Sequence, residues 1–219
     1  MFITALAFVL MPVSQTASTD IARSEQARLN ACIEQIDVDP EEAYEESLDW
    51  LSKGARPAAR YCNGLALLGL GNYEQGAIRL EELANAPDAG SLPDRAIYLA
   101  QSGNAWLSAG YPDAAITTLT NALKIAPNEP DIIKDRASAW LALGSWEEGI
   151  ADLDSALAIF DRDDEAYRLR AHANLQLENL EAARADIEQA LAINGTNIET
   201  LVLRGDIREA TRLASGDVN

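Results

Sequence analysis

Few side chains in this sequence have the type and spacing that catalysis requires. His172 is the only histidine, so neither a two-histidine metal site nor a histidine dyad can form. The sequence also has no glycine-rich phosphate loop that is followed by Lys and then Ser or Thr. Adjacent carboxylates such as Glu147 and Glu148 stand near expected helix starts, where the helix dipole favours negative charge. The residue types therefore predict no enzyme, no cofactor and no metal site.

Composition narrows the class of partner. The 219 residues are 48% hydrophobic, which is enough for a packed core, and 17 Lys and Arg stand against 35 Asp and Glu. The resulting net charge of −18 would repel nucleic-acid phosphates and anionic membrane surfaces. We therefore expect a protein or peptide partner, with no nucleic acid, and no small-molecule substrate is evident.

The first residues resemble a secretory leader. An apolar run extends from Phe2 to Val13, and no charged side chain precedes Asp20. The run is shorter than the roughly 20 residues that a membrane span needs, which favours a signal and export, most simply to a bacterial periplasm. Because no Lys or Arg precedes the run, two alternatives stay open. One is an uncleaved anchor that holds the chain at a membrane, and the other is a buried first helix of a cytoplasmic protein.

The rest of the sequence repeats itself. Columns of small residues and leucines recur, most of them at a spacing of 34: Gly64, Gly103, Ala137, Ala171 and Gly205; Gly71, Gly110 and Gly144; Ala122-Leu123, Ala156-Leu157 and Ala190-Leu191. Within each unit, apolar residues follow helical spacing in two runs of about fourteen residues that a short turn separates. One such hairpin cannot bury its apolar face alone, so consecutive hairpins must stack. The pattern predicts an all-α, right-handed solenoid of helical hairpins.

These units resemble the tetratricopeptide repeat, a 34-residue helix-turn-helix motif. The resemblance is carried by "GNYEQGAIRLEEL", "GYPDAAITTLTNAL", "GSWEEGIADLDSAL" and "ENLEAARADIEQAL". The proline that ends the family's unit is kept at Pro127, whereas Asp161 and Gly195 replace it in the next two units.

The predicted organisation follows from these units. We expect a leader over 1–19, a degenerate hairpin over 20–56, repeats over 57–196, a capping helix over 197–213 and a tail over 214–219. The repeats are expected to form four units, approximately 57–90, 96–129, 130–163 and 164–197. The spacing between the first two units is 39 rather than 34, and the extra residues fall in a turn-rich insertion near 85–94.

The resemblance also implies a binding groove, because the family's first helices line a concave face that holds peptide segments. The implied groove positions are Gln101, Asn104, Lys134, Asp135, Ser138, Arg168 and His172. We expect Lys134 and Arg168 to be exposed and, with Asn104, to donate hydrogen bonds to a peptide backbone or carboxylate. The set departs from the two-carboxylate clamp of chaperone-binding members, and ordinary solvated polar residues are the alternative.

Two functions of different kinds follow. The first is a non-enzymatic interaction module or scaffold that binds a partner's peptide segment in the groove. The second is a structural adaptor that acts through its edges or through the 85–94 insertion.

The only two cysteines are Cys32 in the degenerate hairpin and Cys62 in the first clear unit. They fall on successive first helices, close to the small-residue column at Ala31 and Gly64, so both side chains are expected to point inward. Packed helices can bring such a pair within reach of a disulfide, which an oxidising compartment would favour. The alternative is that both are reduced, small apolar residues of a helical core.

Overall fold

The computed structural model describes residues 13–216. Within that range the chain forms eleven α-helices and no strand. The helices are α1 (Val13–Val38), α2 (Pro40–Ser52), α3 (Pro57–Gly69), α4 (Tyr73–Asn85), α5 (Leu92–Ser108), α6 (Pro112–Ile125), α7 (Pro130–Leu143), α8 (Trp146–Ile159), α9 (Asp164–Gln176), α10 (Leu180–Ile193) and α11 (Ile198–Ala214). Most of the predicted leader lies outside the described residues, and α1 begins inside its last part.

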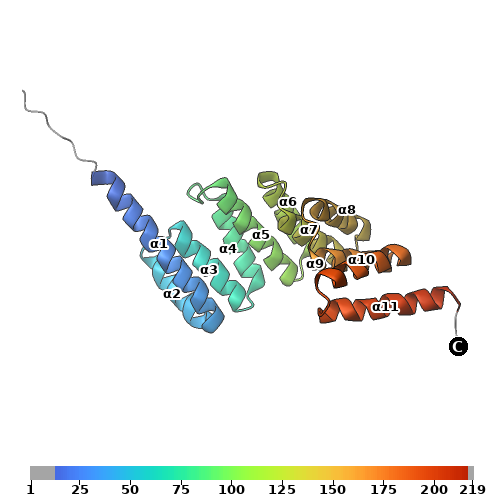
Figure 1. The fold of residues 1–219 in the computed structure, drawn as a ribbon. Helices are drawn as coiled ribbons and strands as arrows, with labels where there is room; N and C mark the ends of the chain where they lie inside the picture. Colours follow the sequence, from blue (N-terminus) through green and yellow to red (C-terminus); the bar gives the residue numbers. More distant parts are fainter. Residues whose placement is uncertain (1–12, 217–219) are drawn as a thin grey trace, which may run out of the picture.

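The helices stack as consecutive antiparallel hairpins in an elongated, curved array (Figure 1). The odd-numbered helices contact one another along the array, α1 with α3, α5 with α7, α7 with α9 and α9 with α11. No comparable contact joins two even-numbered helices in the described part of the chain. The odd-numbered helices therefore form the closer-spaced inner row, and the even-numbered helices form the outer row. The predicted all-α solenoid is confirmed.

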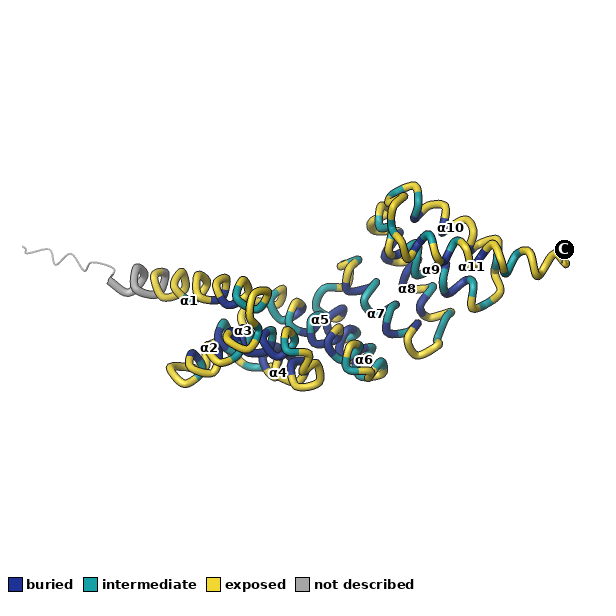
Figure 2. The backbone as a smooth tube through the Cα atoms, turned by 90° about the horizontal axis from the view of Figure 1, so that it is seen from below, coloured by how far each residue is buried: buried dark blue, intermediate teal, exposed yellow. Residues whose placement is uncertain are grey.

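Small residues in the inner row let the two helices of a hairpin approach closely. A Cβ added at Gly103 on α5 would lie 2.4 Å from Cγ of Leu119 on α6, and one at Gly64 would lie 2.9 Å from a methyl of Leu80. Leu80 and Leu119 are fully buried, as is Leu153 in the next outer helix. The buried residues lie along the contact between the two rows, as Figure 2 shows.

The turns inside the four hairpins from α3 to α10 each contain a left-handed residue. Gly71, Gly110 and Gly144 take φ values of 74°, 84° and 82° at the ends of α3, α5 and α7. The same turn after α9 uses Glu178 at φ 61°, the one non-glycine residue with positive φ between residues 13 and 216. Left-handed backbone costs a residue with a Cβ about 1 kcal/mol or more, so the repeat tolerates a small local strain here.

The predicted insertion, which lies between α4 and α5, is held against the repeat body. The Arg95 guanidinium donates hydrogen bonds to the backbone carbonyls of Ala84 and Ala86 at 2.9 Å each. Asp88 pairs with Arg60 of α3 at 2.6 Å, and Ala89 is fully buried. Ser91 begins α5 with a capping box that it shares with Asp94. The insertion is thus a short, anchored turn.

Cys32 of α1 and Cys62 of α3 form a disulfide in the structure, with their Cα atoms 6.1 Å apart. Both residues are buried in one core cluster with Leu29, Trp50 and Ala59. The bond therefore joins two neighbouring helices of the inner row at the first end of the solenoid.

Candidate functional site

The candidate site is the inner row from α5 to α11, where the implied groove residues lie on successive helices. Asn104 of α5 is exposed, and its amide donates a hydrogen bond to Oδ2 of Asp135 on α7 at 2.8 Å. Ser138, one turn further along α7, donates its hydroxyl to the Lys134 carbonyl at 3.1 Å. The Asn104–Asp135 bond crosses from one hairpin to the next, whereas the Ser138 bond stays within α7.

Lys134 on α7 is surrounded by carboxylates. Its ammonium nitrogen lies 2.8 Å from Asp163, 3.1 Å from Glu165 and 3.7 Å from Asp131. Only 15% of its side chain is exposed. Burial alone would lower the pKa of Lys134, but its hydrogen bonds to Asp163 and Glu165 outweigh burial and raise the pKa overall. Lys134 is therefore a paired cation.

Arg168 on α9 is paired in a similar way, with Glu199 of α11 at 3.2 Å and Glu165 at 3.6 Å. Its side chain is 20% exposed, and its Nε is buried without a hydrogen-bond partner. Glu165 thus lies between Lys134 and Arg168 and contacts both. The expectation that these two cations are exposed is wrong, because acidic residues of α9, its N-cap and α11 fold over them.

Gln101 and His172 have different surroundings. Gln101 is only partly exposed, and its side-chain oxygen is buried without a hydrogen-bond partner. The His172 ring packs edge-on against Trp146 at the start of α8, with centroids 5.6 Å apart. Burial, and then the charge of Arg168, lower the pKa of His172, so the ring is neutral near pH 7. Nothing in these contacts points to proton-transfer chemistry.

The electrostatics of this row are acidic. Asp131 and Glu199 keep 84% and 73% of their side chains exposed while they pair with the two cations. Burial raises the pKa of Asp135 to about 6, against the opposing effects of the Asn104 hydrogen bond and the Lys134 charge. Negative charge therefore exceeds positive charge along the row. We call this surface the acidic row; its residues are Asp131, Lys134, Asp135, Asp163, Glu165, Arg168 and Glu199.

A second polar series, which the groove interpretation missed, lies between the two rows of helices. Arg136 of α7 binds Asp152 of α8 through two hydrogen bonds of 2.8 and 2.7 Å. Arg170 of α9 binds Asp186 of α10 in the same way, at 3.0 and 2.6 Å. The signal was present in the sequence, since both arginines precede their aspartates by 16 residues. These pairs join the two helices of a hairpin.

Known proteins share this architecture. A family model described as "Tetratricopeptide repeat" matches residues 107–173. The first tetratricopeptide domain of human RPAP3 is 30% identical over 56% of this chain and 94% of that chain, with a TM-score of 0.53. The chain belongs to the tetratricopeptide-repeat family.

Two further solved structures are similar to this tetratricopeptide-repeat protein. The first tetratricopeptide domain of Spaghetti (RPAP3), solved with the HSP90 peptide SRMEEVD, is 29% identical over 53% of this chain and 92% of that chain, with a TM-score of 0.52. MamA from Desulfovibrio magneticus RS-1, residues 41 to the end, is 16% identical over 81% of this chain and 97% of that chain, with a TM-score of 0.68, and shares the fold. No curated protein matched the sequence.

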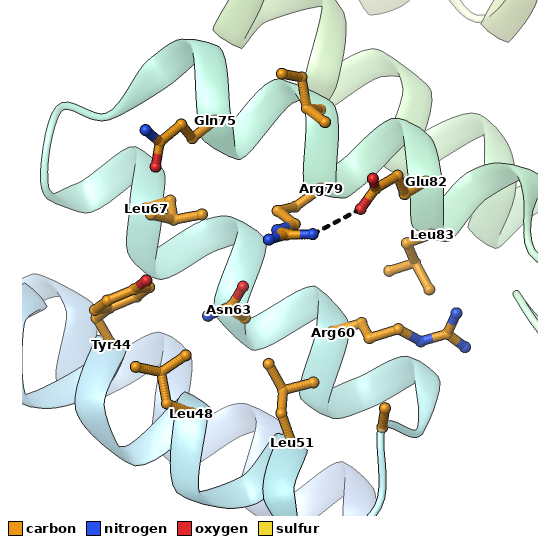
Figure 3. Close-up of a pocket in the computed structure, with 12 residues that line it drawn as sticks. Tyr44, Leu48, Leu51, Arg60, Asn63, Leu67, Gln75, Arg79, Glu82 and Leu83 are labelled. Carbon is orange, nitrogen blue, oxygen red and sulfur yellow. Dashed lines mark hydrogen bonds and ion pairs between the residues drawn. The ribbon is translucent and has the colours of Figure 1, made fainter.

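The tetratricopeptide array also has a groove of about 690 Å³ on its outer side, between α2 and α4 and above α3 (Figure 3). Leu48 and Ile78, 46% and 40% exposed, contribute apolar surface to it. At its edge Arg79 donates to Glu82 at 3.0 Å. This groove contains none of the implied groove residues, and its α2 wall belongs to the degenerate hairpin, which lacks the family's signature.

In residues 13–216, no group of three or more His, Cys, Asp or Glu side chains is arranged to hold a metal ion. Within the same range, no helix combines the length and hydrophobicity needed to cross a membrane.

Proposed function

We propose that this chain is a non-enzymatic protein-interaction module whose acidic row binds a peptide segment with basic side chains. The observation that carries the proposal is the excess of carboxylates around Lys134 and Arg168, with Asp131 and Glu199 left largely exposed. Basic side chains of a peptide would complement this charge, and complementary charge guides both orientation and partner choice. The acidic row does not suit an acidic peptide, because both cations already have carboxylate partners.

One further observation supports peptide binding on the inner row. The Spaghetti domain solved with the HSP90 peptide supports the class of function. Its acidic peptide, however, has the opposite charge to the segment proposed here.

We further propose that the chain is exported to an oxidising, periplasm-like compartment. The apolar run from Phe2 to Val13 and the pairing of the only two cysteines support this location. Thiol counting on denatured, unreduced protein from the native compartment tests it. No free thiol is expected, and two free thiols would contradict export to an oxidising space.

Site-specific photo-crosslinking tests the binding face. A benzophenone amino acid replaces Asn104 on the inner helix α5 or, as the matched control, Asn121 on the outer helix α6, since both residues are exposed asparagines. A partner segment crosslinked from position 104 and absent from 121 is expected. Capture from a probe at Asp88 in the insertion, without capture from 104, would favour the structural adaptor instead.

A synthetic copy of the captured segment then tests the charge preference on the purified chain. Replacing Asp131 and Glu199 together by Lys is expected to weaken binding at least about tenfold, because favourable charge pairs become repulsive. The control changes Glu147 and Glu148 on the outer helix α8 to Lys, which alters the net charge equally. Equal losses in the two variants would indicate only a general charge effect.

A further inference from the structure

The last described inner helix, α11, differs from α7 and α9 in the partners of one arginine. Arg136 on α7 is hydrogen-bonded to Asp152 of the following outer helix and to Thr120 of the preceding one. Arg170 on α9 likewise bonds Asp186 of the following outer helix and Asp154 of the preceding one. In both cases the guanidinium bridges two outer helices across the inner helix that carries it.

Arg136 and Arg170 are 34 residues apart, and Arg204 follows after another 34. We call these three residues the arginine column. Arg204 has the outer helix α10 before it, but no outer helix follows α11 among the described residues (Figure 1). Arg204 makes no hydrogen bond or ion pair with any described residue, and the same holds for Arg208 one turn later. Among the described residues, Arg204 and Arg208 therefore have no partner, on a protein whose net charge is −18.

The backbone beside Arg204 is open as well. A Cβ at Gly205 would meet nothing within 4 Å, whereas the equivalent Cβ at Gly103 would collide with Leu119 of the following outer helix. Among residues 13–216, no side chain therefore fills at Gly205 the place that an outer helix occupies in the other hairpins.

A groove of about 350 Å³ runs along this place, between α10 and α11. Ile187, Leu191 and Ile207 give it an apolar floor, and Ile187 and Ile207 are each only 1% exposed. Arg184, Arg204 and Arg208 line its sides, with Glu188 as its acidic member. Arg184 already lies 3.6 Å from Glu181, which leaves Arg204 and Arg208 to bind a ligand.

We propose that this groove docks an amphipathic helix of a partner protein that carries an acidic side chain toward Arg204. Such a helix completes the last hairpin in trans, since its carboxylate takes the position that Asp152 and Asp186 take in the preceding hairpins. Its apolar side chains cover Gly205 and the partly exposed Leu191. This surface is separate from the acidic row and prefers the opposite charge.

The far end of α11 limits how extensive the docking is. Glu209 stands where α5, α7 and α9 carry Leu107, Leu141 and Leu175, and it pairs with Arg212 at 2.7 Å. The docked helix therefore gains less apolar contact than an internal outer helix does. Reversible binding is expected.

The chain's own α10 provides a probe, because α10 already makes the equivalent contact with α9. A labelled peptide of residues 179–194, which includes Asp186, is titrated into the full chain and followed by fluorescence anisotropy. Saturable binding is expected. The matched peptide with Asp186→Asn is expected to bind about tenfold more weakly, since it loses a charge-assisted hydrogen bond.

Variants of the full chain decide the site. Arg204→Ala is expected to reduce peptide binding about tenfold, and Gly205→Leu, which fills the open position, is expected to abolish it. Arg162→Ala, at an exposed arginine in the α8–α9 loop, is the control and should bind like the wild type. A far-UV spectrum of each variant verifies that the helices remain folded.

Several results would overturn this proposal. One is equal binding by Arg204→Ala and the wild type, which would mean that the peptide displaces α10 or binds elsewhere. Another is no binding of the peptide with Asp186 up to millimolar concentration. A third is concentration-dependent self-association that Arg204→Ala removes, without peptide binding, which would assign the surface to a second copy of this chain.

Discussion

The first and last helices of the described solenoid differ in how they are held. At the first end, α1 and α3 are joined covalently through Cys32 and Cys62, in a hairpin that lacks the family's signature. At the other end, α11 continues the arginine column, but Arg204 has no partner and Gly205 has no neighbour. In a stack where each hairpin contacts mainly its neighbours, the first and last helices of the described array make fewer contacts with described residues than internal helices do. The disulfide adds a covalent link between α1 and α3, whereas the groove between α10 and α11 is the surface proposed for binding.

The largest expected effect comes from breaking the first end. Cys32→Ser with Cys62→Ser removes a crosslink between residues 30 apart, which stabilises by about 3–4 kcal/mol in the chain-entropy model. Because contacts are local, α1 and α2 should loosen while α5 to α10 stay folded. Chemical denaturation followed by circular dichroism measures the loss. An unchanged unfolding curve would show that the packing around Trp50 alone holds this end.

The second effect compares two members of the arginine column. Arg170→Ala leaves Asp186, whose side chain is 8% exposed, without its main partner and should cost about 2–3 kcal/mol. This expected loss of stability is smaller than the loss usual on breaking a fully buried ion pair, because 21% of the Arg170 side chain is exposed. Arg204→Ala is the control and should cost less than about 0.5 kcal/mol, since it breaks no pair. Similar losses at the two positions would mean that Arg204 has a structural role within the chain.

A third comparison should change sign between the middle and the open end. Gly103→Ala drives a Cβ into Leu119 and is expected to destabilise by about 1–2 kcal/mol. Gly205→Ala meets open space, so it should stabilise by about 0.5–1 kcal/mol through better helix propensity. Thermal and chemical unfolding of both variants test this. If Gly205→Ala is as harmful as Gly103→Ala, α11 has a neighbour at that position.

The smallest effect concerns the acidic row between the two ends. Asp135 has its pKa raised from 3.8 to about 6 by burial, so its ionisation opposes folding above pH 6 and has no effect below about pH 4. Asp135→Asn keeps an acceptor for Asn104 and should stabilise by about 1 kcal/mol at pH 7.5, with the gain fading towards pH 4. Asp152→Asn, which weakens the pair with Arg136, should instead destabilise at pH 7.5. A gain from Asp135→Asn that is independent of pH would show that ionisation is not the cause.

The helices and their stacking could be predicted from the sequence because the small columns recur with the hairpins. Gly103 and Ala137 mark places where helices touch, and such contacts depend on spacing within one unit. The pairing of Lys134 could not be predicted in this way. It depends on how Asp163 at the N-cap of α9 lies relative to α7. The residue pattern within one unit does not determine the distance between helices of different units.

The disulfide and the arginine column could be predicted from the sequence only in part. Helical register alone placed Cys32 and Cys62 on adjacent inner helices, and left open whether the sulfurs would meet. The Arg136–Asp152 and Arg170–Asp186 spacing was readable in the sequence, but only the packed hairpin shows that each pair bridges two helices. The role proposed for Arg204 rests on its equivalence to the arginines of those pairs.

Hydrogen exchange on the full chain, with and without the synthetic partner segment identified by crosslinking, tests the central claim most directly. The account predicts slower exchange in the inner helices α5, α7 and α9 when the segment binds, with α6 and α8 unchanged. Protection confined to the outer helices or to the 85–94 insertion would contradict binding at the acidic row.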